Sequence, residues 1–335
     1  MLSERLSLAL SGGDLTLPEG GMIAVFGPRA GTDLSSLPHD RVAVITSFKP
    51  DHDAFAAAGY VCAREATGPC SAALVCLPRA KAQGRALLAQ AADLVGTGGL
   101  LIVDGQKTDG IESMLRDLRA QGLSPMVLSK AHGKMLWFAA RPIPADWHAQ
   151  GPQPVEGGFV TAEGVFSADG IDPASRLLAD SLPDKLGAHL VDLGAGWGYL
   201  ASRILARDTV RSLDLVEADH TALDCARANL ADPRARFHWA DATIWRPDNL
   251  VDAVVMNPPF HTGRAADPDL GRAFIAAAAA MLTAQGRLWL VANRHLPYET
   301  ALAQHFADVS ELAGDNRFKI LAAARPTAPR SRQRR

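Results

Sequence analysis

Apolar residues along this chain gather in short runs, each bounded by turn-forming or charged residues. Four runs lie in each half, at Ile23–Phe26, Val42–Ile45, Ala73–Leu77 and Leu100–Val103, and then at Leu190–Leu193, Leu213–Val216, Val251–Met256 and Leu288–Val291. Short apolar runs of this composition indicate buried strands, and the segments between them have a helical character. Strands that alternate with helices predict an α/β protein whose parallel sheets are covered on both faces.

The two halves also repeat each other. The segments ALVCLP (73–78), GGLLIVDG (98–105) and GKMLWFAARP (133–142) recur in the same order as AVVMNP (253–258), GRLWLVAN (286–293) and RFKILAAARP (317–326). Three matches in one order indicate a duplicated module. A proline-rich stretch from Arg141 to Pro154 is typical of a linker, so we expect one domain over residues 1–150 and a second over 151–335.

The composition is that of a globular protein, with 335 residues of which 48% are hydrophobic and 21% charged. No apolar run approaches the roughly 20 residues that a membrane helix needs, and Glu4 and Arg5 near the start argue against a secretory signal. The four cysteines form no CxxC pair and no metal-ligand spacing (Cys62, Cys70, Cys76 and Cys225). We therefore expect a reduced, cytoplasmic protein with no membrane partner and no metal.

Positive charge gathers at the C-terminus although the net charge is only −2. Residues 1–150 carry 14 basic and 14 acidic residues, and residues 151–335 carry 20 and 22. Five of these 20 lie in the last eleven positions (Arg325, Arg330, Arg332, Arg334 and Arg335). Such a tail is either an arm for a polyanion or a solvated disordered end.

The segment HLVDLGAGWGYLA, residues 189–201, predicts a strand, a glycine turn and the start of a helix. Gly194, Gly196 and Gly198 would let a ligand approach the backbone closely. Asp192 stands just before these glycines, and the chain lacks the GxxxxGK[ST] pattern of a phosphate-binding loop. A carboxylate at this place suits a ligand with a cationic, amino-acid-like part better than a pyrophosphate.

Two further acids stand at predicted strand ends. Glu217 closes the second strand about twenty residues beyond the glycines, where a carboxylate can accept both hydroxyls of a ribose. Asp219 is the competing carboxylate, and Glu217 as an ordinary solvated acid is the plainer alternative. Asp241 ends the next strand and is suited to accept from an adenine amino group, unless it only caps its loop. Together these acids predict a site for a positively charged adenosine compound.

This pattern resembles the class I S-adenosylmethionine-dependent methyltransferases, whose DxGxGxG motif and strand-two acid stand here as Asp192–Gly198 and Glu217. The fourth strand runs into Asn257, Pro258, Pro259 and Phe260, next to where the sulfonium methyl group would lie. The Asn257 side-chain oxygen and the Pro258 carbonyl would accept hydrogen bonds from an exocyclic amine, and the prolines would hold both acceptors in place. Phe260 offers a face on which a planar base can stack. Asn-Pro is also an ordinary turn signal.

A wider set of segments is similar to the bacterial ribosomal RNA guanine-N2 methyltransferases, and most similar to the small subunit methyltransferase C family. These are GVFSADGIDPASRLL (164–178), NPPFHTG (257–263), VANRHLPYE (291–299) and NRFKIL (316–321). The resemblance implies two tandem Rossmann-like methyltransferase domains, the second catalytic. It also implies S-adenosyl-L-methionine as the cofactor, ribosomal RNA or a ribosomal subunit as the partner, and Asn257 to Phe260 at the guanine amine. We expect a monomer.

The first half departs from the motif pattern of that family. If Gly27 matches Gly194, then Val25 replaces Asp192 and Arg29 replaces Gly196. Thr46 and Ser47 stand near the position of Glu217, and Leu77-Pro78-Arg79 replaces Asn-Pro-Pro. This degenerate copy is therefore expected to support RNA docking or folding rather than to bind the cofactor.

Three alternatives stay open from the sequence. Enzymes that methylate adenine N6 or a protein glutamine use related motifs, although they more often carry Tyr or Trp at the position of Phe260. The third is a non-catalytic RNA-binding assembly factor, against which the intact Asp192, Glu217 and Asn257 argue. The sequence does not identify the nucleotide.

Overall fold

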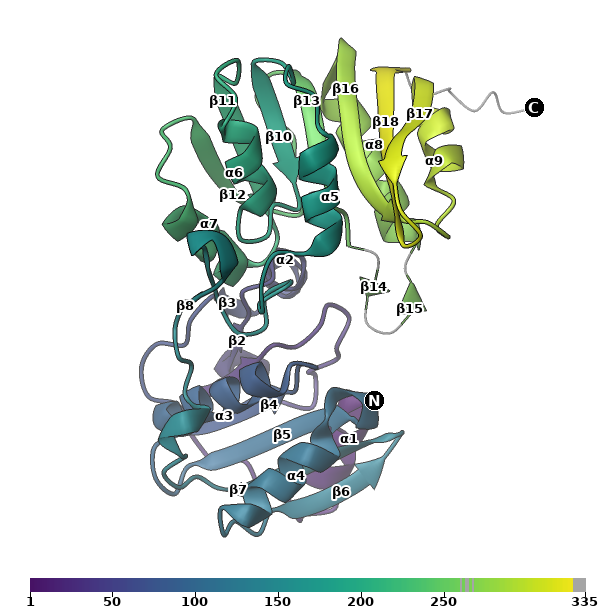
Figure 1. Cartoon of the computed structure of the whole chain (residues 1–335). Coiled ribbons are helices and arrows are strands. Elements are labelled where there is room, and N and C mark those ends of the chain that lie inside the picture. The colour runs from purple at the N-terminus through teal and green to yellow at the C-terminus, as the bar shows by residue number, and fades with distance from the viewer. Residues whose placement is uncertain (260, 263–264, 267, 328–335) are drawn as a thin grey trace, which may run out of the picture. The chain divides into compact units, whose positions relative to one another are not determined.

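The computed structural model describes residues 1–259, 261–262, 265–266 and 268–327. The chain forms two compact units, Met1–Gly151 and Pro152–Arg335, each built on a seven-stranded sheet. Figure 1 shows each sheet with its helices.

The first unit has the strand order β3-β2-β1-β4-β5-β7-β6. Its strands are β1 (Ile23–Phe26), β2 (Val42–Ile45), β3 (Val61–Ala63), β4 (Ala72–Cys76), β5 (Leu100–Gln106), β6 (Met126–Lys130) and β7 (Gly133–Ala139). Its α-helices are α1 (Leu2–Ser11), α2 (Lys49–Ala57), α3 (Lys81–Val95) and α4 (Ile111–Ala120). One face of this sheet packs on α3 and α4, and the other packs on α1 and α2.

The second unit has the strand order β12-β11-β10-β13-β16-β18-β17. Its strands are β10 (His189–Leu193), β11 (Ser212–Glu217), β12 (Ala235–Trp239), β13 (Val251–Met256), β16 (Leu282–Asn293), β17 (Phe306–Gly314) and β18 (Phe318–Pro326). Its α-helices are α5 (Pro173–Ser181), α6 (Tyr199–Leu205), α7 (His220–Asn229), α8 (Pro268–Met281) and α9 (Tyr298–His305). Two small two-stranded sheets join β8 (Gln153–Pro154) to β9 (Val160–Thr161) and β14 (His261–Thr262) to β15 (Ala265–Ala266).

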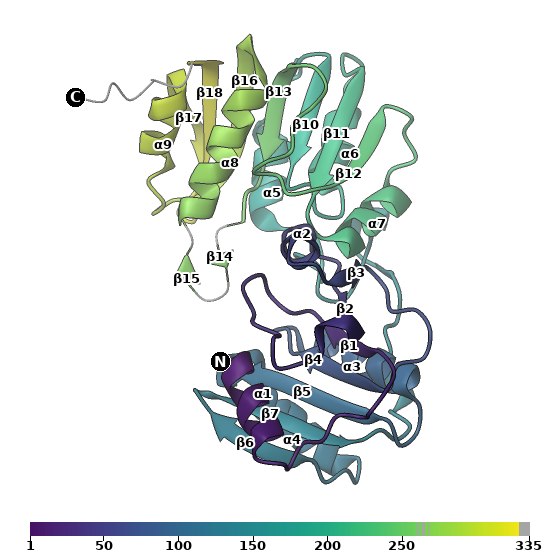
Figure 2. The same ribbon diagram turned by 180° about the vertical axis from the view of Figure 1, so that it is seen from behind.

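Helices cover both faces of the second sheet. Helices α5, α6 and α7 pack on one face around Leu190, Leu215 and Val255, and Figure 1 shows α5 and α6 in front of the strands. Helices α8 and α9 pack on the other face around Val191 and Leu193, and Figure 2 shows α8 from that side. Alternate residues of β10 therefore belong to opposite cores, as the pleat of a strand requires.

The sequence repeats occupy equivalent positions in the two sheets. ALVCLP covers most of β4 and AVVMNP most of β13, and both strands are fourth in their sheet order. GGLLIVDG and GRLWLVAN lie in the fifth strands, β5 and β16, while GKMLWFAARP and RFKILAAARP lie in the sixth, β7 and β18. The chain thus consists of two tandem Rossmann-like domains, as the sequence predicts.

The expectation of wholly parallel sheets is wrong at one edge of each sheet. Strand β5 pairs antiparallel with β7, and β7 with β6; likewise β16 pairs antiparallel with β18, and β18 with β17. Only Ala131 and His132, both at positive φ, connect β6 to β7. A two-residue connection makes a hairpin and is far too short for the crossover that a parallel pair needs.

The structure also bears on membrane-spanning segments and on the cysteines. Within the ranges that the structure describes, none of the helices has the length and apolar character needed to span a membrane. The four cysteines are free thiols, and Cys225, which lies on α7, is buried.

Candidate active site

Three of the predicted side chains lie on one face of the second sheet because each follows a core residue by two positions. Leu190, Leu215 and Val255 all belong to the core under α5, α6 and α7. Asp192, Glu217 and Asn257 come two residues after them and so point to the same side of the pleat. Strands β10, β11 and β13 are parallel neighbours, so these three side chains gather at one carboxyl edge.

The glycine turn between β10 and α6 lies at the same edge. Gly194, Gly196 and Gly198 all have positive φ, at 81°, 54° and 91°, a region that other residues rarely adopt. A Cβ on Gly196 would meet no atom within 4 Å, whereas one on Gly198 would lie 3.0 Å from Leu230. Gly196 therefore leaves room for a ligand, while Gly198 permits close packing of the turn on α7.

Glu217 ties the glycine turn to the end of β11. Its Oε2 accepts from the backbone N–H of Gly196 at 2.8 Å, and its Oε1 accepts from that of Asp219 at 2.8 Å. Burial raises the pKa of Glu217, and these two backbone N–H groups partly oppose that rise. The carboxylate is thus oriented toward the turn, and each oxygen keeps a lone pair for a ligand.

Asp192 is a buried acid without a hydrogen-bond partner. It is fully buried, and in the described part of the chain neither carboxylate oxygen has a hydrogen bond of normal geometry; the backbone N–H of Ala201 only partly offsets the effect of burial on its pKa. Burial, reinforced by the nearby Glu217 carboxylate, raises the pKa of Asp192 to about 8. An ionised carboxylate in such a place costs several kcal/mol unless a cation or donor joins it. The site is therefore poised to receive positive charge.

The remaining two acids are held by local backbone groups. Asp219 caps α7, since its Oδ1 accepts from the N–H of Thr221 at 3.0 Å. The Oδ1 of Asp241 accepts from the backbone N–H and the hydroxyl of Thr243, at 2.8 and 2.7 Å. Asp241 thus caps its loop, which was the plainer alternative for this residue, and its role toward an adenine stays a prediction.

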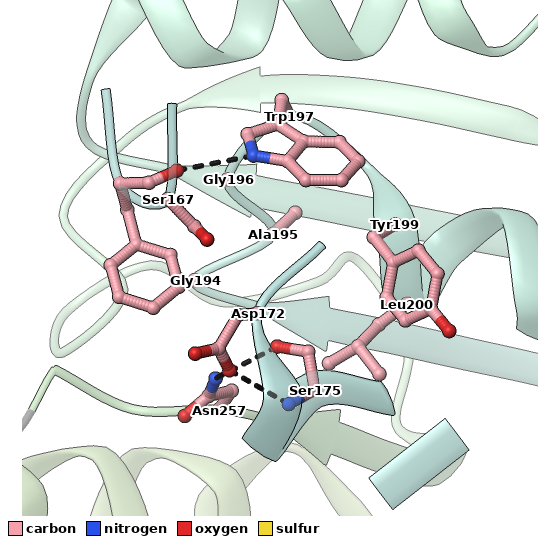
Figure 3. Close-up of a pocket in the computed structure, with 11 residues that line it drawn as sticks. Ser167, Asp172, Ser175, Gly194, Ala195, Gly196, Trp197, Tyr199, Leu200 and Asn257 are labelled. Atoms are coloured by element: carbon pink, nitrogen blue, oxygen red, sulfur yellow. Dashed lines mark hydrogen bonds between the residues drawn. The ribbon is translucent and has the colours of Figure 1, made fainter. Parts of the chain in front are cut away.

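Asn257 lies at the end of β13 with its amide held on one side. Its Nδ2 donates to Oδ2 of Asp172 at 3.0 Å and to Oγ of Ser175 at 2.8 Å. Asp172 in turn caps α5 by accepting from the backbone N–H of Ser175 at 2.8 Å. Figure 3 shows the amide nitrogen directed at these two side chains and the oxygen turned away from them.

These groups share a pocket with residues that our sequence reasoning did not select. Gly194, Gly196 and Asn257 line it together with Phe166, Ser167, Asp172, Ser175, Ala195, Trp197, Tyr199 and Leu200. Phe166 is 62% exposed, and no other Phe, Tyr or Trp in the described ranges is classed as exposed. The segment GVFSADGIDPASRLL pointed to this region, but only as part of a family resemblance.

The segment before α5 is anchored beside the glycine turn. The indole N–H of Trp197 donates to the carbonyl of Phe166 at 3.1 Å. Asn229 on α7 donates to the carbonyls of Val160 and Trp197, at 2.9 and 2.8 Å, and accepts from the N–H of Val160. These bonds place Phe166 at the pocket.

The chain is similar to known methyltransferases over most of its length. The family model described as the methyltransferase small domain matches residues 156–322. The ribosomal RNA small subunit methyltransferase C of Alteromonas mediterranea is 31% identical over 260 residues, which cover 75% of this chain and 72% of the relative. That of Pseudomonas paraeruginosa is 33% identical over 274 residues, with 78% and 82% covered.

The chain belongs to the ribosomal RNA small subunit methyltransferase C family. A solved structure shows the same architecture across both domains. It is the T. thermophilus 16S rRNA N2 G1207 methyltransferase in complex with AdoMet and guanosine, with a TM-score of 0.79 at 26% identity. The match covers 96% of this chain and 91% of that one.

The corresponding edge of the first unit is closed by its own residues. The N–H of Gly27 donates to the carbonyl of Ile45 at 2.9 Å, just as that of Gly194 donates to the carbonyl of Val216 at 2.8 Å. This equivalence places Thr46 where the second unit has Glu217. The buried Asp51 accepts from the N–H of Ala30 at 2.8 Å and pairs with Arg29 at 3.3 Å.

The Asn257–Phe260 motif and the C-terminal arginines lie partly outside the described residues. Phe260 is outside them, so its stacking role stays a prediction; Pro258 is buried and Pro259 exposed. Residues 328–335 are also outside. Arg325, which the sequence groups with the tail, instead makes two bonds to Asp308, each of 2.6 Å.

Proposed function

We propose that this enzyme methylates the exocyclic N2 amine of a guanine in small-subunit ribosomal RNA, with S-adenosyl-L-methionine as the methyl donor. The observation that carries this proposal is the Asn257 amide. It lines one pocket with Gly194 and Gly196 and has its nitrogen engaged by Asp172 and Ser175. No described residue donates to its oxygen, which can therefore accept from an amine beside the cofactor site.

Membership of the family supports the substrate class. The relatives are named for the small ribosomal subunit, and the T. thermophilus enzyme is described as acting on the N2 position of a guanine. The match extends over 96% of this chain, so both domains of that enzyme have counterparts here.

The residues present fit the cofactor. The buried carboxylate of Asp192 has no partner among the described residues, which suits the cationic amino-acid part of S-adenosylmethionine. Glu217 at the end of β11 accepts the ribose hydroxyls, and Asp241 accepts from the adenine amine through Oδ2, since Oδ1 is engaged by Thr243. When bound, the cofactor supplies a methyl group that is activated by the positively charged sulfur to which it is attached. The rest of the cofactor is a good leaving group because it leaves as a neutral thioether.

The protein's part in the reaction is to prepare the amine. The lone pair of an aromatic amine is delocalised into the ring, which makes the nitrogen a poor nucleophile. Asn257 Oδ1 and the Pro258 carbonyl accept hydrogen bonds from its two N–H groups and draw the nitrogen toward a tetrahedral geometry. After methyl transfer the cationic nitrogen loses one of these protons to solvent. The hydrogen bonds strengthen as positive charge develops on nitrogen, so they stabilise the transition state more than the ground state. Phe260 provides the stacking face for the base.

The first domain and the assembly state complete the proposal. Because Asp51 and Arg29 close its strand edge, residues 1–150 do not bind the cofactor and instead support RNA docking or folding. One chain supplies Asp192, Glu217 and Asn257 at a single strand edge, which supports a monomer as the active form. A ribosomal substrate supports a location in the cytoplasm.

Transfer of a tritiated methyl group tests this function. The wild-type enzyme is incubated with small ribosomal subunits and with naked 16S RNA, and the labelled RNA is digested to nucleosides. N2-methylguanosine is the expected product. Labelled N6-methyladenosine would overturn the substrate, and label recovered only in ribosomal protein would point to a glutamine side chain instead.

A further inference from the structure

We propose that Asp172 and Ser175 are positioning residues for the Asn257 amide: Asp172 fixes which way the amide faces, and Ser175 strengthens the contact. The proposal rests on the function proposed above. Both side chains lie at the start of α5, more than eighty positions before Asn257 in the chain, and both accept from its Nδ2, at 3.0 and 2.8 Å. Their task is to keep Oδ1 available to the substrate amine.

The chemistry of the pair allows one orientation of the amide. An ionised carboxylate has no proton to donate, so Asp172 bonds the NH₂ end of Asn257 and repels its oxygen. Nδ2 of Asn257 lies 3.0 Å from Oδ2 of Asp172. If the amide flipped, Oδ1 of Asn257 would take this place and would face the carboxylate oxygen at about the same distance. The Ser175 hydroxyl can bond either end, so it strengthens the contact without deciding its polarity.

The amide needs this constraint because its own torsion is permissive. The last torsion of an asparagine side chain is broad and roughly two-fold. In the flipped state, Nδ2 would face the N–H groups of the substrate, donor against donor. Such a state leaves the amine unprepared, so holding the other state increases the fraction of enzyme that can react.

The positioning residues are themselves well held. The backbone N–H of Ser175 donates to the same Oδ2 of Asp172 that accepts from Asn257, and Ser175 is buried at 7% exposure. Leu178 and Ala179 on α5 are buried in the core shared with β10 and β13. The start of α5 therefore provides a rigid support for the end of β13 (Figure 3).

Two conservative variants test the proposal. Asp172→Asn keeps the volume and the capping ability of the residue, but its amide can present either end to Asn257. Ser175→Ala removes the second acceptor and leaves the cap of α5 in place. We expect kcat to fall roughly 10- to 100-fold in Asp172→Asn, as for other losses of reactive geometry, and by a smaller factor in Ser175→Ala, where Asp172 still fixes the polarity. KM for RNA, the Kd for S-adenosylmethionine and the melting temperature should stay near wild type in both variants. Ser175→Thr keeps the hydroxyl acceptor, so its kcat should be close to that of the wild type.

A double-mutant cycle shows whether the effect passes through Asn257. Once Asn257→Ala has removed the amide, adding Ser175→Ala or Asp172→Asn should lower kcat by no more than about twofold. The matched control is Ser181→Ala at the other end of α5, where the hydroxyl donates to Leu177; it should have wild-type kcat in both backgrounds.

Three results would overturn the proposal. They are a wild-type kcat in both Asp172→Asn and Ser175→Ala, an undiminished effect in the Asn257→Ala background, or a loss of cofactor affinity that accounts for the lost rate. The last would make these residues cofactor contacts. The cycle can be measured on whichever amine the wild type methylates. A product other than N2-methylguanosine would therefore refute the proposed substrate without deciding the role of Asp172 and Ser175.

Discussion

The Asp192 carboxyl group is fully buried and has no hydrogen bond of normal geometry among the described residues. Burial and the neighbouring Glu217 raise its pKa to about 8. The ligand-free folded protein therefore holds Asp192 mostly protonated at neutral pH, while the unfolded chain ionises it near 3.8. As pH rises from the unfolded value toward 8, this group makes the ligand-free protein less stable.

The first prediction is that cofactor binding releases a proton near neutral pH. A cationic ligand favours the ionised form of Asp192, so the affinity for S-adenosylmethionine should rise with pH up to about 8. Calorimetry at pH 7 in buffers of different ionisation enthalpy measures the released proton directly. Asp192→Asn should bind more weakly, release less, and melt at a higher temperature without ligand. Equal proton release by wild type and variant would show that Asp192 is not the group that loses a proton when the cofactor binds.

Individual residues of the site could be predicted to different extents. Asp192, Glu217 and Asn257 follow buried strand residues by two positions, so local periodicity places them at one edge. Asp172 and Ser175 could not be predicted from local periodicity, because their contact with Asn257 depends on how α5 packs against β13. The orientation of the Asn257 amide is equally a product of that packing.

At the scale of secondary structure, an ion-paired cluster joins strands β11 and β12. The buried Asp214 accepts from Arg236 at 2.8 and 2.6 Å, and lies 2.7 Å from Nε2 of His238. Burial alone would raise the pKa of Asp214, but the bonds from His238 and Arg236 outweigh it and lower the pKa. The pairing supports the two strands that end near Glu217 and Asp241.

The second prediction concerns the stability of this cluster. Asp214→Asn should lower the free energy of unfolding by about 1.5–3 kcal/mol at neutral pH, the usual worth of hydrogen bonds to a charged group. The Asp214 contribution is present above its unfolded pKa and is lost as pH falls through the lowered folded pKa. Urea denaturation from pH 7 to 3 measures the loss of stability in Asp214→Asn and its dependence on pH. The control is Asp180→Asn at an exposed position. A penalty that persists undiminished at pH 3 would contradict this account.

The secondary structure was predictable where strands are buried and much less so at sheet edges. Val251–Met256 was predicted with its observed bounds because five of its six residues are apolar. The edge strand β17 was not selected, since after the buried Phe306 its residues are mostly exposed and form no apolar run. The antiparallel edges were also missed, because they depend on short connections such as Ala131–His132 rather than on the apolar pattern.

At the scale of the whole molecule, one fold occurs twice with different chemistry at its strand edge. In the second unit the edge presents Asp192, Glu217 and Asn257, whereas in the first unit Asp51 accepts from Arg29 and from the backbone N–H of Ala30. The sequence predicted this contrast from the missing carboxylates. It could not show that Asp51, which lies on α2 rather than in the turn, takes over the backbone contact there.

The third prediction concerns the C-terminal arginines. Arg325 is paired with Asp308, so Arg330, Arg332, Arg334 and Arg335 remain as candidates for phosphate contacts. Deleting residues 328–335 should weaken RNA binding and reduce the slope of log K against log salt by about 0.7 for each lost contact with single-stranded RNA. Replacing the four arginines with lysines is the control, and should keep most of the slope. A slope unchanged by the deletion would make the tail a solvated end.

The central claim is that the Asn257 side-chain oxygen prepares the guanine amine for methyl transfer. The most direct test is the kcat of Asn257→Ala with saturating S-adenosylmethionine and small-subunit RNA, together with the identity of the residual product. Loss of one preorganised acceptor should reduce kcat roughly 100- to 1000-fold, with KM for RNA little changed and N2-methylguanosine still the product. A variant that methylates its RNA at the wild-type rate would contradict the account.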